Sequence, residues 1–165
     1  MSTATRASRS FRHGTISEKR FAHHLRGLGI DFKTEVGTDA DLKGKIDFVV
    51  QGKTVNVKSP TKSGPPGLCV EWRAVNGSTG WLHKIDYVVK FIDNDSYWRI
   101  PCDKLKELVI AKHGEPPARC PQTGAGRSNG AWYARANWEG KDRTKEACIM
   151  VPLKEIQHLA IEINP

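Results

Sequence analysis

Hydrophobic and polar residues follow two periods along the chain, one typical of helices and one typical of strands. Four apolar residues between Phe21 and Leu28 recur at helical spacing, and Thr15-Ile-Ser-Glu18 has the pattern of a capping box. We therefore expect a helix that begins near Thr15 and ends at Gly27 or Gly29. Residues 1–14 are polar and basic, and we expect them to form a flexible arm.

Short runs of β-branched and aromatic residues predict strands farther along the chain. Two of them surround Gln51-Gly52-Lys53, which predicts a tight hairpin. Residues 39–45 are expected to form a polar connection and residues 113–145 a long basic and aromatic loop. This order of elements predicts one α/β (α+β) domain over residues 15–165, with helices flanking a mixed central sheet. The expected strands are 31–36, 46–50, 54–58, 68–75, 85–92, 97–100 and 148–151, and the expected later helices are 102–112 and 152–159.

The hairpin holds the most informative polar residues. Asn56 and Lys58 are two positions apart on one strand, so their side chains point to the same face. Asp47 joins them if the loop has two residues, either Gln51-Gly52 or Gly52-Lys53, whereas a three-residue loop separates them. Such a face is either an ordinary solvated surface or a metal-and-base site. In the second case the carboxylate holds a hard dication and the lysine acts on the attacking water.

The excess of basic residues suggests that the protein binds a polyanionic partner. The 165 residues include 26 Lys and Arg against 18 Asp and Glu, a net charge of +8. Residues 1–34 contribute +5, residues 35–95 are neutral, and residues 96–165 contribute +3. Basic flanks around a balanced centre are typical of an enzyme that binds phosphates and holds a cation, and equally of a solvated surface with a basic tail. With 38% hydrophobic residues and only short apolar runs, the composition excludes a disordered chain and a membrane-spanning one.

The four cysteines are widely spaced and include no CxxC pair, so they predict neither a disulfide framework nor a zinc knuckle. His113 and Cys120 lie near each other in the sequence, but two ligands do not make a zinc site. The first residues lack the apolar stretch of a secretory signal. We expect reduced thiols and a cytoplasmic protein.

The strand–turn–strand with Asp47 and then Asn56-Val57-Lys58 resembles the PD-(D/E)XK nuclease superfamily, which has the restriction-endonuclease-like fold. In that family an Asp begins one strand, an acid-x-Lys tripeptide ends the next, and a helical Glu often precedes both. Asp47 matches the first acid, Lys58 the lysine and Glu18 the helical acid. The stretch from Val70 to Tyr87 resembles small nuclease-like proteins of phage and mobile elements, so the resemblance covers roughly residues 15–92.

The resemblance implies a DNA endonuclease that uses Mg²⁺ or Mn²⁺ to hydrolyse phosphodiester bonds, nicking DNA or recognising a DNA structure. Asp47, Asn56 and the main-chain carbonyl of Val57 would hold the metal. Lys58 would position or polarise the water, and Glu18 or Glu71 would supply a further carboxylate. Many relatives act as dimers, which makes a homodimer one expectation, and a phage-encoded protein would act in the cytoplasm of the host cell.

One position departs from the family pattern. Its second acid falls on Asn56, an amide that offers a carbonyl oxygen to a metal but no charge. Three explanations stay open: the acid has moved to Glu71 or Glu35, the protein is an inactive nuclease-like module that binds DNA or regulates another DNA enzyme, or the Asn is an inactivating substitution. Glu18 also has two interpretations, because a capping residue would bond the backbone of Thr15 instead.

Basic residues outside the hairpin are the expected DNA contacts. In residues 119–145, arginines alternate with Trp132, Tyr133 and Trp138, a pattern that suits phosphate contacts and stacking on unpaired bases. The aromatic residues can equally fill a small core. An RNA-binding protein is a third hypothesis, which leaves the hairpin pattern unexplained. The expected contacts are Arg6, Arg9, Arg12, Lys62, Arg119, Arg127 and Arg135.

Overall fold

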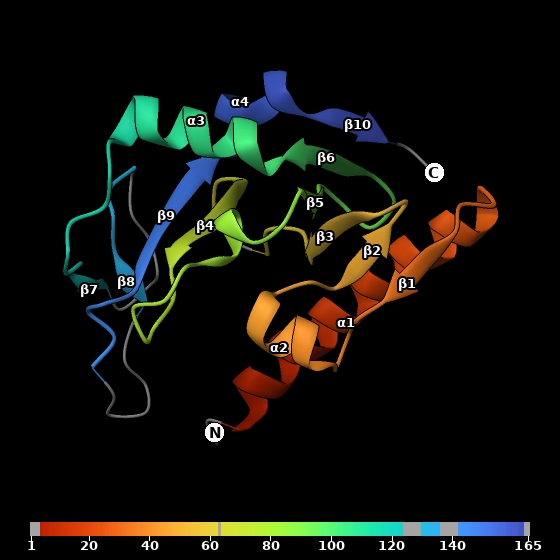
Figure 1. The fold of residues 1–165 in the computed structure, drawn as a ribbon, viewed down its shortest axis with the longest axis horizontal. Helices are drawn as coiled ribbons and strands as arrows, with labels where there is room; N and C mark the ends of the chain where they lie inside the picture. Colours follow the sequence, from red (N-terminus) through yellow and green to blue (C-terminus); the bar gives the residue numbers. More distant parts are fainter. Residues whose placement is uncertain (1–3, 63, 124–129, 136–141, 164–165) are drawn as a thin grey trace.

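The computed structural model describes residues 4–62, 64–123, 130–135 and 142–163, with side chains from residue 14 onward except at residue 43. Its main sheet has the strand order β1-β2-β3-β5-β6-β10 (Figure 1). β3 and β5 run parallel, and the other neighbouring strands run antiparallel. The strands are β1 (Phe32–Thr34), β2 (Phe48–Val50), β3 (Lys53–Lys58), β5 (Tyr87–Phe91), β6 (Tyr97–Pro101) and β10 (Ile161–Ile163). The predicted mixed α/β domain with a mixed central sheet is confirmed.

Helix α1 (Ala4–Gly27) covers one face of this sheet. Phe21 lies edge-on to Phe48 of β2, with the ring centroids 5.2 Å apart, and both belong to a buried cluster that includes Val55 and Val57 of β3. Because side chains alternate along a strand, Asn56 between these two valines points to the opposite face of the sheet. The helix therefore decides which face of β3 is apolar and which is polar.

A second layer covers the opposite face. β4 (Gly67–Arg73) pairs antiparallel with β9 (Ala147–Pro152), and Figure 1 shows α3 (Cys102–His113) and α4 (Leu153–Ile156) near one end of this pair. Val70 of β4 and Ile149 of β9 are fully buried in one cluster with Val88 of β5 and Ile100 of β6. The short helices η1 (Trp81–His83) and η2 (Gln157–Leu159) complete this side. The polar residues of β3 thus face the β4–β9 layer.

The hairpin has the first of the two loops considered from the sequence. Phe48 lies opposite Val55 and Val50 opposite Lys53, which leaves Gln51-Gly52 as a two-residue loop. Both loop residues have positive φ, 50° and 77°, as the tight turn between twisted strands requires. The two-residue loop on which the grouping of Asp47 with Asn56 and Lys58 depends is therefore present. The strand pairing itself ends at Phe48 and Val55, and the N–H of Asp47 also donates to the carbonyl of Val55.

The first helix begins earlier than the capping pattern predicts. Residues 4–14, expected as a flexible arm, are helical, and Thr15 and Glu18 lie inside α1. Alanine and arginine, which have high helix propensity, recur in this segment and continue the helix through the capping pattern. The capping role considered for Glu18 is therefore wrong, because no helix begins at Thr15.

Two expected connections also contain regular structure. Residues 39–45 include helix α2 (Asp39–Gly44), whose first turn holds two aspartates and which ends at Lys45 with a φ of 59°. The loop expected over residues 113–145 contains the parallel strand pair β7 (Gln122–Thr123) and β8 (Ala134–Arg135). No helix in the described ranges is long and apolar enough to cross a membrane.

Candidate active site

Asp47 and Asn56 are buried beside the polar end of β3. Their exposed fractions are 5% and 4%, so the interpretation of this face as a solvated surface is wrong. Oδ2 of Asp47 accepts a hydrogen bond from the main-chain N–H of Val57 at 2.6 Å, which holds the carboxylate against β3. The backbone of Asp47 is tied as well, because its N–H donates to the carbonyl of Val55 at 2.9 Å.

Burial raises the pKa of Asp47 to about 7, although the hydrogen bond from Val57 and the positive charge of Lys58 both lower it. The negative charges of Glu18 and Asp41 raise it further. A buried carboxylate facing two other acids favours any cation that neutralises it. Two cations could neutralise Asp47 here, a proton or a metal ion.

Only one of the two polar atoms of the Asn56 side-chain amide forms a hydrogen bond. Nδ2 donates to the carbonyl oxygen of Lys45 at 2.6 Å, while Oδ1 is buried and has no hydrogen-bond partner. Buried carbonyl oxygens in folded proteins nearly always have a donor or a cation. Oδ1 of Asn56 is therefore available to a cation, and an amide oxygen is a ligand that hard dications accept.

Lys58 ends β3 with its side chain partly buried, and Nζ lies 5.3 Å from the ring centroid of Trp81. Burial lowers the pKa of Lys58, and the negative charge of Asp47 acts in the opposite direction. Lys90 lies beside Lys58 in the parallel register and donates from Nζ to the carbonyl of Ser59 at 2.5 Å. Burial and the charge of Lys58 lower the pKa of Lys90 to about 8. This second lysine was not predicted, although a lysine inside the apolar run of β5 was a visible signal.

Glu18 and Asp41 bring two more carboxylates toward the site from α1 and α2. Burial raises the pKa of Glu18, the charge of Asp41 raises it further, and the charge of Lys58 lowers it. Asp41 also accepts a hydrogen bond at Oδ2 from the N–H of Gly37 at 2.8 Å. The predicted neighbourhood of Glu18 and Lys58 is present, and Asp41 was missed because its helix was interpreted as a connection.

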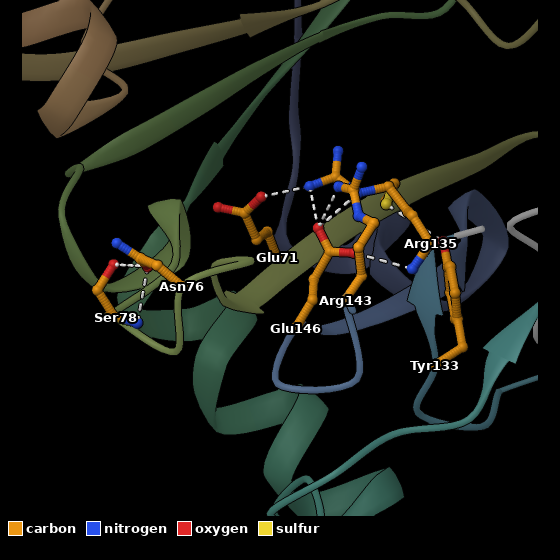
Figure 2. Close-up of polar contacts among 8 residues, drawn as sticks. Glu71, Asn76, Ser78, Tyr133, Arg135, Arg143 and Glu146 are labelled. Atoms are coloured by element: carbon orange, nitrogen blue, oxygen red, sulfur yellow. Dashed lines mark hydrogen bonds and ion pairs between the residues drawn. The ribbon is translucent and has the colours of Figure 1, made fainter. Parts of the chain in front are cut away.

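Glu71, the first candidate for a displaced acid, belongs to a neighbouring ion-pair network (Figure 2). Its Oε2 accepts a hydrogen bond from Nη2 of Arg135 at 2.7 Å, while its Oε1 is buried and unpartnered. Arg135 also binds Glu146, a fully buried acid that contacts Arg143 at 3.1 Å. The negative charge of Glu71 nevertheless raises the pKa of Lys58. The network thus borders the candidate site, and Glu71 is committed to an arginine within it.

Glu35, the second candidate for a displaced acid, is engaged elsewhere. It forms an ion pair with Lys33 and accepts a hydrogen bond at Oε2 from the hydroxyl of Thr38 at 3.1 Å. The hydrogen bond from Lys33 lowers its pKa. Neither candidate therefore occupies the place of the acid missing at Asn56, and Asp41 is the additional carboxylate whose charge reaches Asp47.

The predicted DNA contacts fall into three groups. Lys62 is exposed, and Arg119 is exposed with an ion pair to Asp142 at 2.7 Å. Arg135 is held by Glu71 and Glu146 with 41% of its side chain exposed. Trp132 and Tyr133 are buried, which favours their core interpretation. The side chains of Arg6, Arg9 and Arg12 on α1, together with Arg127 and Trp138, lie outside the described residues.

The residues fit a Mg²⁺-type ion better than a zinc ion. In the described part of the chain, no group of three or more His, Cys, Asp and Glu side chains could hold a metal. Asp47 and the unpaired Oδ1 of Asn56 nevertheless supply two oxygens of the kind that Mg²⁺ takes. Mg²⁺ is usually bound by one or two carboxylates and keeps several waters, so a complete protein cage is not required.

Comparisons of the chain with models of protein families, with curated proteins and with solved structures find no match. The interpretation of the site therefore depends on its geometry and on the short motif in the hairpin.

Proposed function

We propose that the protein is a divalent-metal-dependent DNA endonuclease with a restriction-endonuclease-like domain. The carrying observation is the buried pair of Asp47, with its pKa raised to about 7, and Asn56, with an unpaired Oδ1, next to Lys58. Such a pair is costly unless it serves a ligand. The net charge of +8 supports a nucleic acid substrate, and the match of Asp47 and Lys58 to the nuclease motif supports phosphodiester chemistry.

Each side chain at the site would have its own role. Asp47 and Oδ1 of Asn56 would hold Mg²⁺ or Mn²⁺, with Glu18 and Asp41 adding negative charge around it. The metal supplies charge stabilisation at the phosphate and lowers the pKa of bound water. Lys58, whose pKa is lowered by burial, is suited to orient the attacking water and to exchange a proton with it. Lys90 holds the carbonyl of Ser59 and so orders the chain directly after Lys58.

The test is cleavage of supercoiled plasmid with Mg²⁺ or Mn²⁺. Lys58→Ala is expected to abolish cleavage and to leave DNA binding intact, because Lys58 serves the water more than the duplex. Lys53→Ala is the matched control, since it removes an exposed lysine from the other end of the same strand. Equal cleavage by the wild type and Lys58→Ala would contradict the proposal.

One observation favours a second function, an inactive nuclease-like module that binds DNA. The hydrogen bond from Nδ2 of Asn56 to the carbonyl of Lys45 requires an amide, because an ionised carboxylate at this place would face the carbonyl oxygen. If neither the wild type nor Asn56→Asp cleaves plasmid, and both bind DNA in a salt-dependent and chelator-independent way, the module is the function.

A further inference from the structure

The outer face of helix α1 is basic. Between Ile16 and Arg26 the exposed side chains recur as one face of a helix requires, and the residues between them are buried or half-buried. No acid is exposed on this stretch, because the single acid of the 24-residue helix, Glu18, is half-buried and lies near the candidate site. The exposed residues are Ile16, Lys19, Arg20, His23 and Arg26.

The positive charges of this face have no counterion within the described part of the chain. Neither Lys19 nor Arg26 forms an ion pair there, and Arg26 lies over the ring of Phe32, with Cζ 5.5 Å from the centroid. Arg20 donates to Oδ1 of Asn94 at 2.8 Å, and this amide is a neutral partner. The three charges therefore remain available to an external anion.

Exposed basic residues on another helix do have carboxylate partners. On α3, Lys104 forms an ion pair with Glu107 at 3.1 Å, and Lys112 forms one with Glu155 at 3.3 Å. Each of these positive charges meets a negative charge of the protein itself, which weakens its attraction for an external anion. The outer face of α1 is therefore a better surface for a polyanion than α3, although both helices carry exposed lysines.

The length of α1 matches a DNA duplex. Its 24 residues extend about 36 Å, and one turn of B-DNA is about 34–36 Å long. Basic side chains along a helix of this length can contact successive phosphates of the duplex. This face is also close to the candidate site, because Glu18 precedes Lys19 in the sequence and its pKa is lowered by the charge of Lys58.

We propose that the outer face of α1 is the docking surface for duplex DNA, with Lys19 and Arg26 in contact with its phosphates. The choice of DNA among polyanions rests on the proposed nuclease function. The duplex lies along α1 and passes the candidate site beside Glu18. Contacts to phosphates position the duplex and carry no preference for a base sequence.

The test is the salt dependence of DNA binding. Fluorescence anisotropy of a labelled duplex of about 30 base pairs is measured in buffer with chelator, so that no metal-dependent cleavage occurs. Lys19→Gln/Arg26→Gln removes two positive charges and keeps residues of good helix propensity. Each lost phosphate contact is expected to lower the slope of log Kd against log salt by about 0.9, which gives a decrease of about 1.8 for the double variant.

Two further variants serve as controls. Lys104→Gln/Lys112→Gln makes the same change in net charge on α3 and should keep the wild-type slope, because both lysines are already paired with carboxylates. Lys19→Arg/Arg26→Lys keeps both charges of the α1 face and should also keep this slope. Circular dichroism checks that the variants fold. If Lys19→Gln/Arg26→Gln does not fold, Lys19→Gln alone takes its place, with an expected decrease of about 0.9.

Three results would overturn the proposal: no binding of the duplex by the wild type, an unchanged slope in Lys19→Gln/Arg26→Gln, and an equal decrease in the α3 variant, which would mean that only net charge matters. Failure of the nuclease proposal looks different. Duplex binding that depends on the α1 face, without plasmid cleavage by the wild type, would refute the nuclease alone. Plasmid cleavage with the wild-type KM and slope in Lys19→Gln/Arg26→Gln would refute the α1 surface alone.

Discussion

Replacing Asp47 by asparagine is expected to stabilise the metal-free protein at alkaline pH. Asp47 is 5% exposed, and its pKa rises from 3.8 to about 7 on folding, mainly through burial. The folded state therefore binds a proton that the unfolded chain releases, and stability is lost as the pH rises from about 4 to about 7. In Asp47→Asn the amide oxygen would still accept from the N–H of Val57 without carrying a charge, so the variant escapes this loss.

The size of the effect follows from the pKa difference. A shift of about 3 pH units, at about 1.4 kcal/mol per unit, corresponds to a loss of about 4 kcal/mol at pH 8 and above. At pH 5 the folded carboxyl group is still protonated, and the loss is only about 1.5 kcal/mol. The advantage of Asp47→Asn over the wild type should therefore grow by about 3 kcal/mol between pH 5 and pH 8.

The assay is urea unfolding in the presence of chelator at several pH values. Asp31→Asn serves as the matched control, because it makes the same substitution at an exposed aspartate. In a second series, Mn²⁺ should stabilise the wild type at pH 8 and leave Asp47→Asn unaffected. A difference between Asp47→Asn and the wild type that stays constant with pH would refute the reasoning, since it would show that Asp47 does not titrate with a raised pKa.

Two further predictions concern the framework of the site. Gly80→Ala should destabilise the fold, because a Cβ there would overlap the carbonyl group of Glu71. Gly27→Ala, at a helical position with open space around it, should be neutral or stabilising. Thermal unfolding compares the two variants, and equal decreases in the melting temperature would contradict the packing argument. Glu146→Gln should cost about 3 kcal/mol in urea unfolding, because it leaves Arg135 and Arg143 short of a fully buried counterion. Asp142→Asn, in an exposed pair, should leave the unfolding midpoint unchanged.

Local patterns in the sequence were sufficient to locate the hairpin and most strands. Gln51-Gly52 between two β-branched runs predicted the turn, and the period of two placed Asn56 and Lys58 on one face. Helix α2 was missed although Thr38 and the acids after it form a helix-start signal, because six residues offer too short a period to recognise. Strand β10 was also missed, because three residues are too few to show a period. These residues pair with β6 only after the chain has folded.

The sequence by itself determined which residue types stand at the candidate site: an acid at 47, an amide at 56 and a lysine at 58. It left open whether this face is solvated, because alternation assigns residues to faces without saying what covers each face. Only the tertiary structure decided this, through α1 packing on the valines of β3 and the β4–β9 layer closing the polar side. That enclosure raises the pKa of Asp47, brings in Asp41 and Lys90 from distant segments, and commits Glu71 to Arg135. Burial and charge depend on neighbours far away in the sequence, and for that reason no local pattern could predict them.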